Sequence, residues 1–224
     1  MICGMRKISF EVGEYYHVYN RGVDKRSIVD DDYDSNRFVQ ALEEFNDIEL
    51  IGSIYENSFR KSQLGSLAPK SKKLVNIICY CLNPNHFHLL LKQVATNGIS
   101  RFMHKLGSGY TNYFNEKYGR SGGLFQGTFK AKHIGTNDYL QYLSAYVNLN
   151  NLGHQISGKA SRLVRSSWRE YIDGENKKSI CDRKIILNQF KSIGEYQNYC
   201  TDTLPLVIEN KKLSKELNDL GFEE

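Results

Sequence analysis

Two histidines, His86 and His88, are the first residues whose spacing indicates chemistry. They follow Pro84 in an apolar segment whose composition is typical of a strand. Side chains alternate between the two faces of a strand, so His86 and His88 point to one side and Phe87 to the other. Two imidazoles on one face can share a metal ion. An isolated pair of this kind is more often structural, so other residues must decide between the two interpretations.

A second set of polar residues, Tyr142, Tyr146 and Asn150, recurs at a spacing of four. On a helix this spacing places all three on one face. A tyrosine one turn before an amide would bring a phenol nucleophile next to a metal ion that the amide oxygen helps to bind. The chain has 15 tyrosines, so packing of an amphipathic helix is the ordinary alternative.

The remaining histidines show no partner spacing and are interpreted as structural or surface residues: His17, His104, His133 and His154. The five cysteines are odd in number and scattered, which is typical of a reduced cytosolic chain rather than of a disulfide scaffold.

The net charge of +5 is unevenly distributed along the chain. Residues 11–50 contain eleven acidic and four basic side chains, whereas residues 58–135 contain twelve basic side chains and one acidic. Such a local excess predicts a polyanionic partner, because each neutralised phosphate releases condensed counterions. The alternative is that the lysines only solvate loops.

The composition indicates one globular domain with a real core, since 40% of the 224 residues are hydrophobic. The longest apolar runs are far shorter than the roughly 20 residues of a membrane helix, and no secretory signal follows Met1. We therefore expect a cytoplasmic protein without a membrane partner. No phosphate-binding loop of the P-loop type is present, so no nucleotide cofactor is expected.

The pattern of elements predicts strands and helices in alternation. Strand character is found in residues 14–22 and in residues 75–94, the latter interrupted at Pro84. Helical patterns follow the acidic residues 30–34, cover residues 99–118 with an interruption at 107–109, and cover residues 137–149 with Asn137 as N-cap. After residue 153 the chain is polar and predicts loops, short helical patches and a frayed charged tail over 211–224.

Four segments occur in an order that resembles a known family: 15–22 (YYHVYNRG), 82–91 (LNPNHFHLLL), 119–131 (GRSGGLFQGTFKA) and 146–150 (YVNLN). They resemble the single-tyrosine HUH transposases, and in particular the REP-associated tyrosine transposases of the IS200-like family. Residues 166–171 (SSWREY) are similar to that group's segment after the catalytic helix. The resemblance extends from about residue 12 to residue 199.

This resemblance implies a catalytic role for four residues. His86 and His88 match the metal-binding pair, Tyr146 matches the nucleophile, and Asn150 matches the amide that completes a Mg²⁺ or Mn²⁺ site. The sequence departs from the family's pattern at five positions: Ala145, Asn148, Asn151, Phe125 and Thr128. Arginine is usual at positions 145 and 128, so Ala145 and Thr128 remove two potential phosphate contacts.

The implied reaction is cleavage and transfer of single-stranded DNA beside hairpins of repeated palindromes, through a 5′-phosphotyrosine and a free 3′-OH. Phe125 is expected either to stack on a base or to anchor its loop in the core. Candidate DNA contacts are Asn20, Arg21, Lys105, Arg120, Phe125, Lys130 and Lys132.

The implied fold is an α+β sandwich of the RRM or ferredoxin-like kind, with an antiparallel sheet carrying His86 and His88 on a central strand. Residues 12–153 would form the catalytic domain and 154–224 a helical C-terminal extension with a charged tail. We expect a monomer in the cytoplasm, associated with the nucleoid, with a dimer as the alternative. Rival functions are a domesticated hairpin-binding protein that no longer cleaves, and a replication or conjugation nickase.

Overall fold

A five-stranded antiparallel sheet forms the centre of the computed structural model, which describes residues 8–64, 72–173 and 179–219. The strand order across the sheet is β4-β1-β3-β2-β5, and every neighbouring pair is antiparallel. The strands are β1 (Tyr15–Arg21), β2 (Val75–Asn83), β3 (His86–Gln93), β4 (Lys130–Ile134) and β5 (Arg165–Ser166). The predicted α+β class with an antiparallel sheet is confirmed.

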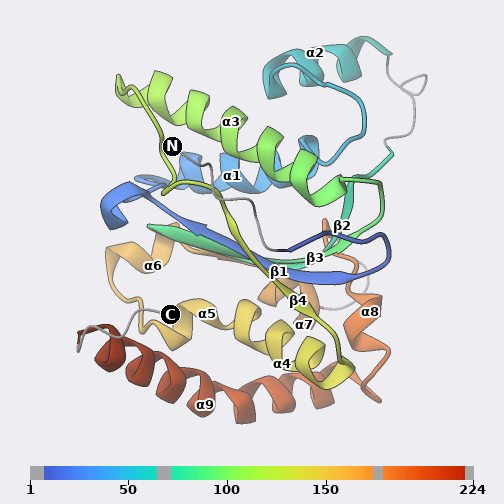
Figure 1. The fold of residues 1–224 in the computed structure, drawn as a ribbon, viewed down its shortest axis with the longest axis vertical. Coiled ribbons are helices and arrows are strands. Elements are labelled where there is room, and N and C mark those ends of the chain that lie inside the picture. The colour runs from blue at the N-terminus through green and yellow to red at the C-terminus, as the bar shows by residue number, and fades with distance from the viewer. Residues whose placement is uncertain (1–7, 65–71, 174–178, 220–224) are drawn as a thin grey trace.

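Helices cover both faces of this sheet (Figure 1). One layer contains α1 (Asp32–Glu44), α2 (Ile54–Leu64) and α3 (Gly98–Tyr118). The opposite layer contains α4 (Asn137–Asn148), α5 (Asn150–Gly153), α7 (Trp168–Ile172), α8 (Lys184–Leu187) and α9 (Ile193–Asp219). A 3₁₀ turn (Val23–Lys25) follows β1, and the short helix α6 (Lys159–Leu163) contacts α1. Each layer encloses its own apolar cluster against the sheet. No helix in the described ranges is long and apolar enough to cross a membrane.

The central strands β2 and β3 are buried on both faces, which explains their continuous apolar sequence. They form a hairpin around the turn at residues 84 and 85, as Pro84 predicts. The Pro84 carbonyl accepts hydrogen bonds from the backbone amides of Ile28 and Val29, so the turn is fixed to the chain that leads into α1. This arrangement holds the start of β3, and with it His86, in a rigid part of the fold.

The caps of two helices show how local sequence fixes their starts. Asp31 caps α1 and forms a capping box with Asp34, in agreement with the predicted acidic start. For α4 the predicted cap was wrong: Thr136 Oγ1 accepts from the backbone amide of Tyr139 at 3.3 Å, and Asn137 is the first helical residue. A threonine in extended conformation leaves its hydroxyl free to bond the first turn, which is the ordinary N-cap geometry.

Helix α3 runs without interruption through Gly107 and Gly109, where the sequence indicated a break. A Cβ at Gly109 would lie 2.3 Å from the ring of Phe45. The glycine is therefore required for close packing of Phe45 against the helix, and tertiary contacts outweigh its poor helix propensity.

The chain after Gly153 is more ordered than its polar sequence suggests. It contributes β5, which pairs with β2, and the long helix α9, which packs against α4 and α5. The tail expected to be frayed from residue 211 onward is helical to Asp219, and residues 220–224 lie outside the described residues. The division into domains at residue 153 stays a prediction.

Candidate active site at the centre of the sheet

Strand pairing decides which side chains share a face of the sheet, because directly opposed residues on neighbouring strands point the same way. His88 lies opposite Tyr19, and His86 lies opposite both Arg21 and Asn83. Phe87 points into the other layer, where its ring contacts those of Phe38 and Phe125. The predicted alternation of His86, Phe87 and His88 is thus confirmed.

Helix α4 packs on the histidine face and brings Tyr146 to it. The Tyr146 ring lies edge-on to His88, with the ring centroids 5.6 Å apart. Burial raises the pKa of the Tyr146 phenol to about 12, although the neighbouring Asn150 amide acts in the opposite direction. The phenol is therefore neutral at ordinary pH, and it needs a nearby positive charge to act as a nucleophile.

Asn150 reaches the same place from the start of α5, after a break in helical geometry at Leu149. Its side chain is fully buried, and its Oδ1 accepts a 2.8 Å hydrogen bond from Asn83 Nδ2. The same Asn83 Nδ2 lies 2.9 Å from His86 Nε2. The Asn150 Nδ2 atom is buried and has no hydrogen-bond partner among the described residues.

His17 joins the site from β1, a position that the sequence analysis interpreted as structural or surface. Its Nε2 lies 2.9 Å from His88 Nδ1, and its ring centroid is 5.9 Å from that of Tyr146. Burial, together with the charge of Lys132, lowers the pKa of His17 to about 4. The signal for His17 was its alternation with Tyr19 and Arg21 in β1, but only the strand register shows that this face meets His88.

The ring nitrogens of the predicted histidine pair suit metal binding. His86 Nδ1 lies 2.7 Å from Asn85 Oδ1, an atom that only accepts, so Nδ1 carries the proton and Nε2 keeps its lone pair. When His88 Nδ1–H donates to His17, Nε2 of His88 likewise keeps its lone pair. Metal-binding histidines usually donate their second N–H in this way. Among the described residues, no group of three His, Cys, Asp or Glu side chains is placed to hold a metal ion, so a site here would need the amide of Asn150 as well as the histidine pair.

Lys211 is a second residue of the site that no sequence pattern indicates. From α9 its Nζ donates to the backbone carbonyl of Asn150 at 3.0 Å and lies 5.1 Å from the centroid of the Tyr146 ring. Burial lowers the pKa of Lys211 to about 7. Nothing in its local sequence distinguishes it from the surrounding charged residues, and only the packing of α9 against α5 brings it to the site.

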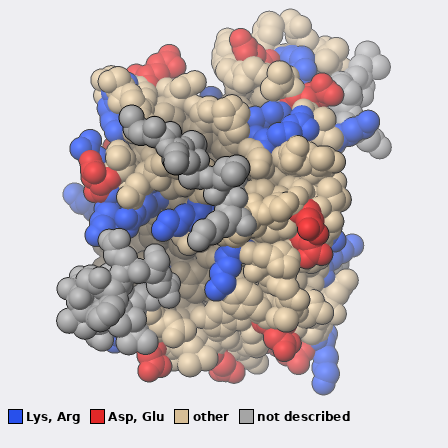
Figure 2. All heavy atoms as spheres, in the orientation of Figure 1, with Lys and Arg blue, Asp and Glu red and all other residues tan. Residues whose placement is uncertain are grey.

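Three of the predicted DNA contacts lie on the histidine face. Lys132 is opposite His17 and Lys130 is opposite Tyr19, so both point to this side of the sheet, and Arg21 is opposite His86. The Arg21 guanidinium is bonded to the side chain of Gln126. Figure 2 shows a group of Lys and Arg side chains across the middle of the visible surface, with Asp and Glu mainly toward its edges.

The other four predicted contacts belong to the opposite layer or to its edge. The Lys105 ammonium donates to the carbonyls of Asp47 and Glu49, both at 2.6 Å. The Arg120 guanidinium lies 5.5 Å from the centroid of the Phe114 ring, and Asn20 Nδ2 donates to the carbonyl of Gly127 at 3.3 Å. The structure does not bring these residues together with Tyr146.

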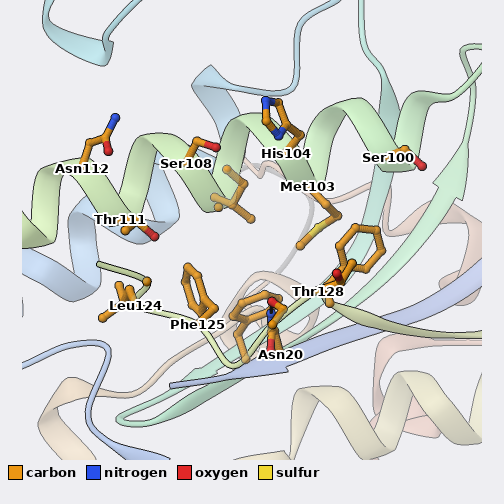
Figure 3. Close-up of a pocket in the computed structure, with 16 residues that line it drawn as sticks. Asn20, Ser100, Met103, His104, Ser108, Thr111, Asn112, Leu124, Phe125 and Thr128 are labelled. Atoms are coloured by element: carbon orange, nitrogen blue, oxygen red, sulfur yellow. Dashed lines mark hydrogen bonds between the residues drawn. The ribbon is translucent and has the colours of Figure 1, made fainter. Parts of the chain in front are cut away.

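Phe125, the fourth of them, lines a cavity of about 570 Å³ between α3 and the glycine-rich loop before β4 (Figure 3). Its ring is half-buried and contacts those of Phe87 and Tyr110. One edge thus anchors the loop in the core, while the rest of the ring faces the cavity beside Asn20 and Thr128.

Part of the candidate site lies inside a region that matches a known family. Residues 61–150 match the family described as "Transposase IS200 like". This part of the chain is similar to IS200-like transposases. The match includes the histidine pair, Tyr146 and Asn150, and it confirms the resemblance that the sequence motifs indicate. No curated protein matches the sequence.

A solved structure, described as that of a REP-associated tyrosine transposase bound to a REP hairpin, is similar to this chain at 13% sequence identity. The similarity covers 79% of this chain and 89% of the other, with a TM-score of 0.49.

Acid should destabilise this transposase-like site when no metal is bound. Because the folded chain keeps His17 neutral down to a pH of about 4, whereas the unfolded chain binds a proton near 6.5, stability is lost as the pH falls through this window. Between pH 7 and pH 5, His17 should lower the free energy of unfolding by about 2 kcal/mol. Urea denaturation in EDTA should show this loss in the unmodified protein and a correspondingly smaller one in His17→Gln; equal losses would contradict the prediction.

Proposed function

We propose that the protein is a metal-dependent transposase that cleaves single-stranded DNA beside hairpins of REP-like palindromes and rejoins strands through a 5′-phosphotyrosine. The observation that carries this proposal is the convergence of Tyr146, the histidine pair and Asn150 on one face of the sheet. The family match over the same region supports it.

In the proposed reaction, the Tyr146 oxygen attacks the scissile phosphorus. The new bond joins the phenol oxygen to the 5′-phosphate as the phenol loses its proton. The bond from phosphorus to the 3′-oxygen breaks, and that oxygen takes up one proton and leaves as a 3′-OH. The bond energy is conserved, so a different 3′-OH can reverse the step and join two strands. No water and no nucleotide cofactor is consumed.

His86, His88 and Asn150 are the residues that would hold Mg²⁺ or Mn²⁺; the amide oxygen is a ligand that these ions prefer, and three ligands leave positions for phosphate oxygens and water. When bound there, such an ion would supply positive charge that polarises the phosphate and offsets the negative charge of the attack. His17 orients His88 through their 2.9 Å contact. Lys211 fixes the backbone of Asn150, and in its protonated form it places a positive charge next to the Tyr146 ring.

Substrate binding is assigned to the basic residues of the histidine face. Lys130 and Lys132 extend from β4 beside β1, and Arg21 ends β1 next to His86. They would contact the DNA backbone, which positions a strand without reading its sequence. We expect the protein to act as a monomer in the cytoplasm, at the nucleoid.

Replacing both Lys130 and Lys132 by Ala should weaken binding to a labelled single-stranded hairpin about tenfold or more at moderate salt. It should also reduce the slope of log affinity against log salt by about 1–2, because two phosphate contacts are lost. Lys105→Ala is the matched control, since its ammonium group is bound to carbonyls in the other layer. Equal losses in the double variant and in the control would rule out this basic face as the binding surface.

The test of the proposed function is an adduct assay. Purified protein is incubated with Mn²⁺ and labelled hairpins from repeats that flank its own gene. We expect a labelled band at the size of the protein that disappears with EDTA. Tight binding without any adduct would overturn the proposed cleavage.

The alternative function is a hairpin-binding protein that no longer cleaves, and the departures from the family's pattern favour it. Ala145 is a buried residue of α4, and Thr128 is exposed beside the cavity. Neither side chain supplies the phosphate contact that an arginine would make.

A further inference from the structure

Asn83 occupies a special place between two of the proposed metal ligands. It is the last residue of β2, and its side chain is fully buried. Its single Nδ2 atom lies 2.9 Å from His86 Nε2 and 2.8 Å from Asn150 Oδ1. The two N–H groups of one amide therefore point at the two lone pairs that would bind a metal ion.

In a site without a metal ion, a hydrogen-bond donor is needed at the position of Asn83 Nδ2. His86 Nε2 and Asn150 Oδ1 are both acceptors, so they can share a buried space only if a donor or a cation lies between them. Asn83 supplies that donor. A bound cation would attract the same two lone pairs and make the donor unnecessary.

The distances also match those of a metal-bound arrangement. In an octahedral site with bonds of about 2.0–2.1 Å, neighbouring ligand atoms are about 2.9 Å apart. The terminal nitrogen of Asn83 stands at this distance from each of the two ligands. If the amide group rotated by half a turn about the Cβ–Cγ bond, Oδ1 would take the place of Nδ2. Three acceptor atoms would then surround one point.

The surroundings of Asn83 allow this turn at low cost. Its Oδ1 currently contacts the thiol of Cys81, with the sulfur 3.7 Å away. A thiol is a weak donor and a weak acceptor, so it can receive the N–H groups after the turn as well as it now serves the oxygen.

We propose that Asn83 is a further metal ligand, which turns its amide oxygen toward a divalent ion held by His86, His88 and Asn150. This inference rests on the metal site of the proposed function and adds a residue to it. We therefore expect the affinity for the metal to depend on whether the side chain at position 83 provides an oxygen ligand, and of which kind.

Titration of the full-length protein with Mn²⁺, followed by calorimetry and by the EPR signal of free Mn²⁺, tests this proposal without any DNA. Asn83→Leu should weaken Mn²⁺ binding about 10–100-fold. Asn83→Asp has nearly the same shape and should bind Mn²⁺ at least as tightly as the unmodified protein, because a carboxylate is a stronger ligand than an amide. Asn76→Leu, on the same strand and bonded to Asp182, is the matched control and should leave the affinity unchanged.

The outcomes separate this inference from the proposed function. If the unmodified protein binds Mn²⁺ no better than His88→Ala does, the metal site itself is refuted and the inference with it. If His88→Ala loses binding but Asn83→Leu does not, the site stands and Asn83 is not a ligand. If Asn83→Asp binds as poorly as Asn83→Leu, position 83 acts only as a hydrogen-bond donor, and the proposal is overturned.

Discussion

Tyr146→Phe is expected to abolish formation of the covalent DNA adduct, with a loss of at least about a thousandfold, because no other phenol can replace the missing oxygen at the same position. The ring itself would keep its packing against His17 and His88, so the fold should be retained. The affinity for hairpin DNA should change by less than about threefold. The measurement is the yield of labelled protein in the adduct assay, with binding measured in parallel by fluorescence anisotropy.

Tyr142→Phe is the matched control for this variant. Tyr142 lies one turn earlier on α4, and its ring centroid is 6.5 Å from that of Tyr146. Its hydroxyl contacts Asn210 on α9, and the structure gives it no contact with the histidines. This control should keep nearly full activity. An adduct that survives in Tyr146→Phe and disappears in Tyr142→Phe would move the nucleophile to Tyr142.

The second large effect is expected for His88→Ala, which should lower metal-dependent cleavage at least about a hundredfold. The variant removes one proposed ligand and also leaves His17 without its 2.9 Å partner. Binding of DNA should persist, because the phosphate contacts assigned to β4 do not involve the histidine. Single-turnover cleavage across a Mn²⁺ series is the measurement.

His104→Ala serves as the control for His88→Ala, since His104 lines the cavity on the other side of the sheet (Figure 3). It should cleave at a normal rate. Unchanged cleavage in His88→Ala would make the buried histidines a packing feature of the sheet and would refute their proposed role.

Much of this site follows from local periodicity. The alternation of a strand places His86 and His88 together, and the helical spacing of four relates Tyr146 to Asn150. Asn150 nevertheless lies beyond the end of α4, at the start of α5, so the helical face predicted for the three residues ends before it. The break at Leu149 is what turns its amide inward toward Asn83.

The residues that the sequence could not reveal reach the site through long-range packing. His17 meets His88 only because β1 pairs with β3 in one particular register. Lys211 arrives on α9, a helix whose position depends on its contacts with α4 and α5. Neither the register of a sheet nor the docking of a distant helix is encoded in a short sequence motif.

The distribution of charge along the sequence did not predict which basic side chains share one surface. The basic excess of residues 58–135 is divided between the two layers of the fold: Lys130 and Lys132 face the histidines, whereas Lys105 faces the loop at residues 47–49. The pairing of β4 with β1 places Lys130 and Lys132, whereas Lys105 is placed by α3 in the other layer.

The most direct measurement of the central claim is to locate the DNA on the protein. The adduct formed with a short labelled hairpin would be digested with nuclease and trypsin, and the modified peptide would be fragmented in a mass spectrometer. We predict a nucleotide joined through its 5′-phosphate to Tyr146. A nucleotide on Tyr142, on Tyr19 or on any other residue, or hairpin that is bound and never attached, would contradict it.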